Sequence, residues 1–341
     1  MRVDRSLGKD IGATASEARA LEAAGYDAIW TGETKHEPFL QMLVAAQNTE
    51  RALIGTEIAI AFARTPMVLA HAGYDLQQYS RGRFVLGLGS QVKPHIERRF
   101  SMPWSHPAAR MREFVLAMRT IWDCWQQGTD LDFQGDFYTH TLMTPFFSPA
   151  PHEWGPPRVF LAGVNERMTE VAGEVCDGFF FHPFTTPRYL REVTMPALVR
   201  GRQKAGLDSL EAFDICGPAF ATIGRNDEEL AAAIAGTKSQ IAFYASTPAY
   251  RTVLDRHGWG DLQPELTSLT KQGRWKDMAA MIDDDMLNEF SVVGTPEHVA
   301  EGLVSRFGEI ATRLTLYTTY PIDDEVAAEV SDLVRTGAKA S

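Results

Sequence analysis

The sequence predicts an α/β fold in which eight parallel strands close into a (β/α)8 TIM barrel that also carries insertion segments. Short, continuous apolar runs alternate with helical patterns, and they make about eight βα units when a first strand within residues 2–7 is counted. Such runs, separated by helices, are typical of a parallel sheet that is buried on both faces. A doubly wound open sheet is the alternative, but its glycine-rich dinucleotide-binding motif is missing after the first strand.

The first half of the chain is expected to supply four of these units. Thr14 and Glu17 have the spacing of a capping box, and Gly25 follows the helical pattern that they open. After the first strand, apolar runs predict further strands over 26–31, 54–61 and 84–88. Apolar residues at helical spacing predict helices over 15–24, 41–51, 66–80 and 110–127.

The alternation resumes after residue 158. Thr186 precedes Pro187 and Thr295 precedes Pro296, so each threonine is placed to cap a helix that starts with proline. Strands are predicted over 159–162, 178–181, 213–223 and 314–318. Helices are predicted over 167–175, 189–205, 227–241, 296–307 and 323–335.

We expect residues 1–341 to form one domain with two insertions that do not fit the alternation. Residues 130–157 are rich in proline and aromatic side chains, which favours a long loop with a short hairpin. Residues 245–289 are polar and are expected to be irregular. Long loops in a compact domain are often lids over a functional site.

Composition and charge exclude several classes of protein. The chain has 33 Lys and Arg against 44 Asp and Glu, and this net charge of -11 argues against non-specific binding to nucleic acid or anionic membranes. The charged residues 1–10 predict no signal peptide, and no run of apolar residues reaches the length that predicts a membrane span. Three cysteines without a CxxC motif predict a reduced, cytoplasmic protein. Metal-binding motifs are missing too, so no metal site is expected.

Side chains that follow the strands are candidates for a site, because the active site of such a barrel lies at the C-terminal ends of its strands. Glu33, Lys35 and His36 crowd together in the loop after the second strand. Glu57 lies inside the third apolar run, where a carboxyl group needs a hydrogen bond or a bulge. A polar layer of the barrel interior is the alternative place for it. His182 directly follows the sixth strand and is expected to face the same end.

Two glycine-containing loops have features of a phosphate or coenzyme site. Small residues within 87–92 let a ligand approach the backbone closely, and 162–168 place a glycine turn before a helix whose free N–H groups suit phosphate. Residues 81–113 hold seven Lys or Arg against two acidic residues, which suits a phosphate or polycarboxylate ligand. A set of surface ion pairs is the alternative explanation.

Several of these segments occur together in an order typical of one enzyme family. They are residues 21–31, 54–56 with 64–66, 80–89 (SRGRFVLGLG), 159–163 with 171–178, and 293–297 (VGTPE). The chain therefore resembles the luciferase-like monooxygenase superfamily, in its branch of coenzyme F420-dependent oxidoreductases. The similarity spans nearly the whole chain, and its motifs identify no substrate.

The resemblance implies a bacterial luciferase-like barrel whose third strand is bulged at a cis peptide bond between Glu57 and Ile58. This bulge would support the central ring of coenzyme F420, a 5-deazaflavin that bears a phosphate and an oligoglutamate tail. Lys93, Arg98 and Arg99 are expected to meet the acidic tail. The residues predicted to bind the coenzyme are Glu57, Ile58, Gly89, Ser90, Gln91, Val92, Lys93, Ala162, Gly163, Val164, Met168 and His182.

The catalytic prediction starts from a departure from the family pattern. Many members carry Asp-His after the second strand, whereas this chain has Glu33-Thr34, so the histidine's role cannot be carried over to Thr34. We predict that Glu33, with His36, supplies a proton or orients the coenzyme while a hydride moves between F420 and a small organic substrate. The family also implies a homodimer.

Two other functions are compatible with the same residues. The first is an FMN-dependent monooxygenase that uses reduced flavin and O2 on the same fold. The second is a protein that binds flavin or deazaflavin without turnover, which the departure at Thr34 leaves open. Binding and oxygen-dependence assays with each coenzyme distinguish the three.

Overall fold

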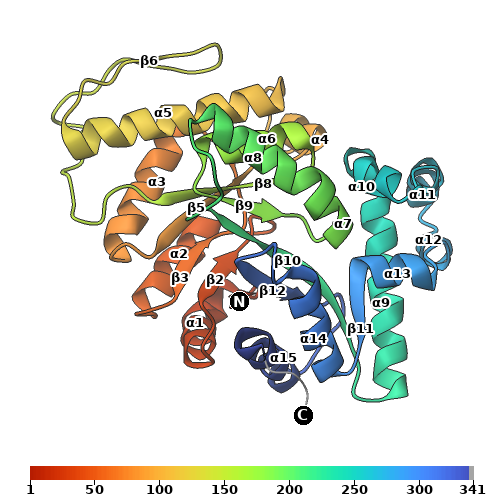
Figure 1. Cartoon of the computed structure of the whole chain (residues 1–341). Helices are drawn as coiled ribbons and strands as arrows, with labels where there is room; N and C mark the ends of the chain where they lie inside the picture. Colours follow the sequence, from red (N-terminus) through yellow and green to blue (C-terminus); the bar gives the residue numbers. More distant parts are fainter. Residues whose placement is uncertain (338–341) are drawn as a thin grey trace.

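Parallel strands close into a barrel in the computed structural model, which describes residues 1–337 (Figure 1). Its eight strands are β1 (Arg2–Ser6), β2 (Ala28–Thr31), β3 (Leu53–Thr56), β5 (Phe84–Gly89), β8 (Arg158–Gly163), β9 (Gly178–Phe181), β10 (Asp214–Ile223) and β12 (Arg313–Tyr317). They follow chain order around the ring, and the ring closes because β12 pairs with both β10 and β1. The predicted TIM barrel is confirmed.

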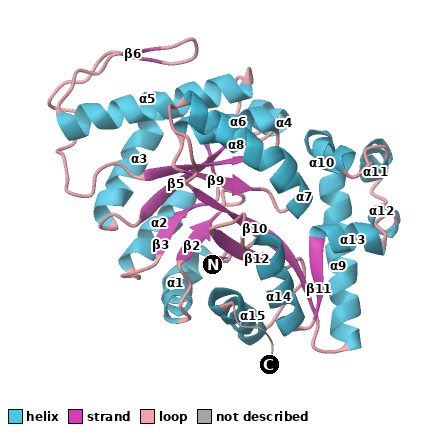
Figure 2. Ribbon diagram, viewed as in Figure 1, coloured by secondary structure: helices cyan, strands magenta, loops and turns pink. Residues whose placement is uncertain are grey.

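Helices surround these strands (Figure 2). They are α1 (Thr14–Ala23), α2 (Pro38–Gln47), α3 (Pro66–Tyr79), α4 (Lys93–Arg98), α5 (Pro107–Gln127), α6 (Glu166–Val175), α7 (Pro187–Tyr189), α8 (Met195–Lys204), α9 (Asp227–Ala245), α14 (Pro296–Phe307) and α15 (Asp324–Thr336). Thr65, Thr186 and Thr295 cap α3, α7 and α14 by accepting hydrogen bonds from first-turn N–H groups. Among residues 1–337, no helix combines the length and the hydrophobicity that crossing a bilayer requires.

The predicted capping box at Thr14 and Glu17 is wrong. A 3-10 turn, η1 (Ile11–Ala13), runs directly into α1, so Thr14 already has helical dihedral angles and lies fully buried. Its hydroxyl accepts a hydrogen bond from Gln41, while the Glu17 carboxylate accepts one from the N–H of Gly8. Asp10 supplies the cap of the turn instead.

The segment 245–289 is helical, so its expected irregular structure is wrong. It contains η4 (Pro248–Tyr250), α10 (Arg251–Arg256), α11 (Leu262–Lys271), α12 (Trp275–Ala280) and α13 (Asp284–Phe290), and it leads into a short strand, β11 (Ser291–Gly294), that extends beside β10. The helices lie next to α9 and share an apolar cluster with it (Figure 1). They are short, and Gly258 and Gly273 follow two of them in the left-handed conformation.

The segment 130–157 matches its prediction. It holds one antiparallel hairpin, formed by β6 (Phe133–Gln134) and β7 (Thr139–His140), and no other helix or strand. The hairpin projects beyond α5 in Figure 1. Glu113 on α5 holds its turn by accepting the N–H groups of residues 136–138.

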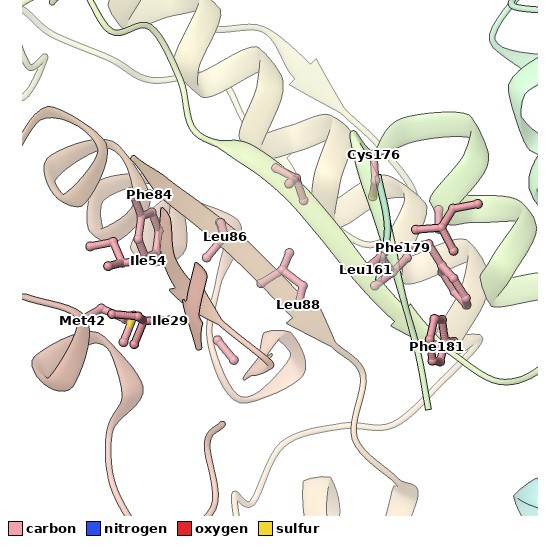
Figure 3. Close-up of a cluster of buried hydrophobic side chains, with 14 of the residues drawn as sticks. Ile29, Met42, Ile54, Phe84, Leu86, Leu88, Leu161, Cys176, Phe179 and Phe181 are labelled. Carbon is pink, nitrogen blue, oxygen red and sulfur yellow. The ribbon is translucent and has the colours of Figure 1, made fainter. Parts of the chain in front are cut away.

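Side chains of the barrel strands alternate between two apolar layers. One layer faces the helices, and part of it is drawn in Figure 3. It includes Ile29, Ile54, Leu86, Leu161 and Phe179 from the strands, and Met42 of α2 packs into it. The other layer fills the barrel interior with Ala28, Trp30, Val85, Phe160, Phe180 and Cys216. The barrel is therefore a packed core and not a pore below its C-terminal end.

One buried ion pair crosses this interior. Arg313 on β12 donates two hydrogen bonds to Asp4 on β1, at 2.8 Å and 2.6 Å, and each side chain is 1% exposed. Trp30 Nε1 donates a third hydrogen bond to the same carboxylate at 3.0 Å. This network ties the last strand to the first two, and its bonds offset the desolvation that burial of two charges requires.

Arg313→Met is expected to destabilise the protein by about 3–5 kcal/mol, because it leaves the Asp4 carboxylate buried without a partner. Asp4→Leu combined with Arg313→Met should lose clearly less than the two single changes added together. Urea unfolding curves of the wild type, Asp4→Leu, Arg313→Met and the double variant provide the free energies of unfolding. Arg225→Met, at an exposed pair with Asp323, is the control and should change stability by less than about 1 kcal/mol. Equal losses in Arg313→Met and in the control would contradict this account.

Candidate functional site

A cavity of about 1630 Å³ lies at the C-terminal end of the barrel. Every strand of the ring contributes to its wall: β10 does so through Pro218 in its middle, and the others through their last residues or the loop that follows. Further wall segments come from the loop before α5 and from α9 with the turn after it. Convergence of eight strand ends on one enclosed space is the arrangement in which barrels of this type bind ligands.

The structure brings all the predicted coenzyme-binding residues to this one cavity. Those that line it are Glu57, Ile58, Gly89, Ser90, Gln91, Val92, Lys93, Ala162, Gly163, Val164, Met168 and His182. The two residues predicted to be catalytic do not belong to the lining: His36 is exposed on the β2–α2 loop, and Glu33 is turned toward Arg64. The role assigned to them stays a prediction that the geometry does not support.

The predicted strand 54–61 is divided by a bulge. β3 ends at Thr56, a short strand β4 (Ala59–Ile60) follows, and the Glu57–Ile58 peptide bond between them is cis, as the family resemblance implied. β4 resumes the parallel ladder on β5, the same strand that β3 pairs with, so the chain bulges out of this ladder between Thr56 and Ala59. Glu57 and Ile58 are thereby released from strand pairing and reach the cavity.

Glu33 holds this bulge from the side. Its backbone N–H donates to the carbonyl oxygen of Ile58 at 3.0 Å, and its carboxylate accepts the N–H of Ile60 at 2.8 Å. Arg64 donates to the same carboxylate oxygen at 2.7 Å. Both side-chain contacts use one carboxylate oxygen, Oε2, and the Glu33 side chain is only 7% exposed.

Glycine is required on β5 because the bulge packs against this strand. A Cβ atom on Gly89 would lie 2.7 Å from Cδ1 of Ile58, and one on Gly87 would lie 1.8 Å from the carbonyl oxygen of Thr56. Thr56 adds two hydrogen bonds to the backbone of Gly87. Gly87 and Gly89 therefore leave the space in which Ile58 packs at the cavity wall.

The carboxyl group of Glu57 is the least expected group in the site. Its Oε1 atom is buried and has no hydrogen-bond partner within the described residues. Desolvation by burial, assisted by the negative charge of Asp4, raises the pKa of Glu57 to about 8. With a pKa near 8, the neutral carboxylic acid is the predominant form at pH 7, and its O–H can donate a hydrogen bond.

The N-terminus of α6 opens onto the opposite part of the cavity. Residues 162–168 line it, and the N-cap residue Asn165 makes no side-chain hydrogen bond to the first turn. Asn165 instead accepts a hydrogen bond from Thr252, at 3.4 Å. The uncapped N–H groups at the positive end of a 10-residue helix are suited to a phosphate or another anion. Arg167, also in the lining, adds positive charge at the rim.

A third wall is aromatic and neutral. Tyr244 on α9 hydrogen-bonds Tyr317 on β12 at 2.8 Å, and the rings of Tyr244 and Tyr250 both pack against His182. Burial lowers the pKa of His182 to about 3, so the imidazole is uncharged. Its Nδ1 accepts the N–H of Phe184 at 3.0 Å, which leaves the proton on Nε2 as a donor.

Sequence reasoning missed this aromatic wall. Tyr317 lies near the end of the predicted strand 314–318 and could have been found by the argument used for His182. Tyr244 and Tyr250 lie in and beyond α9, whose predicted end at residue 241 is four residues short. The basic stretch 81–113 is only partly available to a ligand. Arg83 donates to backbone carbonyls of residues 46–52. The alternative of ion pairs holds for Arg112, with Glu174.

No group of three or more His, Cys, Asp or Glu in residues 1–337 is placed to hold a metal ion. The apolar and hydrogen-bonding walls described above fit an organic molecule that carries an anionic group.

Comparisons with known proteins agree with this fold and site. The chain is 52% identical to an uncharacterized protein of Mycobacterium tuberculosis over 314 residues, 92% of each chain. It is 27% identical to a putative coenzyme F420-dependent oxidoreductase of the same organism, over 82% of this chain and 83% of the relative. A 5,10-methylenetetrahydromethanopterin reductase of Archaeoglobus fulgidus is 25% identical, over 83% and 82% of the two chains.

Among solved structures, the fold resembles the coenzyme F420-dependent tetrahydromethanopterin reductase from Methanopyrus kandleri, with a TM-score of 0.81 and 19% identity over 98% of this chain and 99% of that one. The family described as luciferase-like monooxygenase matches residues 2–313. The chain therefore belongs to the luciferase-like monooxygenase family.

Proposed function

We propose that this protein is an oxidoreductase that transfers a hydride between coenzyme F420 and a small organic substrate. The observation that carries the proposal is one cavity in which the bulge at Ile58 and the uncapped N-terminus of α6 both take part. The first can support a flat ring and the second can bind a phosphate on that ring's side chain. F420 also occurs in the names of several relatives, which supports this coenzyme over FMN.

The residues present fit such a coenzyme. Ile58, in contact with Gly89, presents an apolar surface to a ring, and residues 162–168 at the start of α6 line the same cavity. Lys93 is 62% exposed at the rim, where an acidic tail would leave the cavity. When bound, a 5-deazaflavin supplies a carbon that exchanges a hydride.

The chain's own part in the reaction is to position, to exclude water and to bind the substrate's polar group. A bulge fixed by Glu33 and the two β5 glycines restricts the motion of whatever rests on Ile58. The aromatic wall faces the remaining space with neutral hydrogen-bonding groups, namely His182 Nε2–H and the hydroxyls of Tyr244 and Tyr317. These groups suit an uncharged carbonyl or hydroxyl on a partly apolar molecule.

Coenzyme choice is tested by titrating the purified protein with F420 and with FMN while fluorescence is recorded. We expect saturable binding of F420 and much weaker binding of FMN. Hydride transfer to or from a panel of carbonyl compounds and alcohols, equal in the presence and absence of oxygen, would support the oxidoreductase. Preference for FMN with oxygen consumption would support the monooxygenase instead, and tight binding without turnover would support the binding protein.

Gly89→Ala is expected to raise the Kd for F420 at least about tenfold, because the added methyl group pushes the Ile58 side chain toward the ring's place. The matched control is Gly236→Ala on α9, where a Cβ meets no atom closer than 3.4 Å. Fluorescence titration of both variants measures the effect. Equal affinity of Gly89→Ala and the control would remove the bulge from the coenzyme site.

Glu33→Gln distinguishes two roles. A proton-transfer role predicts a fall in turnover of roughly 10²-fold, a changed pH profile and an unchanged Kd for F420. A positioning role, which the contacts to Ile60 and Arg64 support, predicts a higher Kd with a pH profile of unchanged shape. We expect the second result. His36, the predicted homodimer and the cytoplasmic location stay predictions.

A further inference from the structure

The carboxyl group of Glu57 is a cavity-lining group to which the proposed function assigns no role. Two acidic residues contribute to the cavity wall, and they differ in kind. Glu166 lies at the rim, is exposed, and pairs with Arg200 at 2.8 Å. Among residues 1–337, Glu57 Oε1 is buried and has no hydrogen-bond partner, although buried polar atoms are hydrogen-bonded in the great majority of cases. A buried, unpaired carboxyl oxygen at a cavity wall is suited to a hydrogen bond with a bound molecule.

The charged and titratable groups around Glu57 explain why it has no partner. Asp4 on β1 repels a second negative charge, and the guanidinium of Arg313 on β12 already makes two hydrogen bonds to Asp4. Cys216 on β10 is fully buried, and burial raises its pKa well above the usual thiol value, so it offers no charge. Arg64 is bound to Glu33 and Glu37. Among residues 1–337, Asp4 is the charged group that acts on Glu57, and it disfavours the carboxylate.

We propose that Glu57 acts as a neutral carboxylic acid that donates a hydrogen bond to a carbonyl oxygen or ring nitrogen of the molecule bound in the cavity. The inference rests on the proposed function, because the acceptor it requires is a polar ring such as a deazaflavin. A carboxyl group is both donor and acceptor when protonated and only an acceptor when ionised. Ionisation of Glu57 would therefore remove the hydrogen bond and place a negative charge against the ligand.

This role couples ligand binding to a proton. Since the pKa of Glu57 is raised to about 8, the donor form predominates below that pH and is lost above it. By linkage, affinity for the ligand should be constant at lower pH and fall about tenfold per pH unit above about 8. Binding in turn should raise the pKa of Glu57, because the bound state favours the protonated acid.

The test is a fluorescence titration of the full chain with F420 at intervals from about pH 6 to about pH 10. For the wild type we expect the Kd to rise above about pH 8 as stated. Glu57→Gln replaces the acid with an amide of similar shape that donates at every pH, so its Kd should be nearly independent of pH. Glu265→Gln, at an exposed position on α11, should behave as the wild type. Titration of F420 itself would change the Kd of all three proteins in the same way. The ratio of the wild-type Kd to the Glu57→Gln Kd at each pH therefore reports on Glu57 alone.

A second measurement uses ligand-free protein and tests the protonation of Glu57 directly, so it does not require that any variant binds F420. The infrared carbonyl band of a protonated carboxylic acid should disappear from the wild type with a midpoint near pH 8 and be missing in Glu57→Gln. A wild type that binds F420 with the same pH dependence as Glu57→Gln would overturn the role of Glu57, as would the lack of this band. Failure of F420 to bind any of the proteins at any pH, with the infrared band present, would instead overturn the proposed coenzyme.

Discussion

The site depends on the packing of one irregular turn of chain against a strand that has no side chains in its way. At Glu57 and Ile58 the third strand leaves its ladder, and Gly87 and Gly89 on β5 leave the space that this requires. Any larger residue at Gly87 would collide with the backbone of Thr56. The consequence is that one apolar side chain and one carboxyl group reach the cavity from a position where regular strands would point them elsewhere.

A second constraint is the way charge is distributed along the barrel axis. The Asp4–Arg313 pair occupies the interior below the cavity and is satisfied internally, with the help of Trp30. Directly toward the C-terminal end, Glu57 is left without a cation, and the imidazole of His182 is uncharged. The floor and the aromatic wall are thus polar but neutral, while positive groups such as Lys93 and Arg167 lie at the rim. A ligand with a neutral ring and an anionic tail matches this gradient.

Much of this architecture follows from sequence because periodicity and cap chemistry are local. Apolar runs located the ring strands, and the Thr-Pro pairs at 186–187 and 295–296 located helix starts. Local patterns failed where tertiary contacts decide: Thr14 is helical because a 3-10 turn precedes it and Gln41 binds its hydroxyl. The polar segment 245–289 contains helices because α9 covers their apolar faces, which no short-range pattern reports.

The site, too, could be predicted from the sequence only where position along the chain determines it and not where tertiary contacts do. Position after a strand sufficed to find the cavity-lining residues at 89–93 and 162–168. It did not indicate that Arg64 and the N–H of Ile60 bind the carboxylate of Glu33, because only the fold brings these groups together. A crystal structure of the complex with F420 tests the central claim most directly. We predict that the ring contacts Ile58 and that the phosphate lies at the first turn of α6; a ring packed elsewhere, away from the bulge, would contradict it.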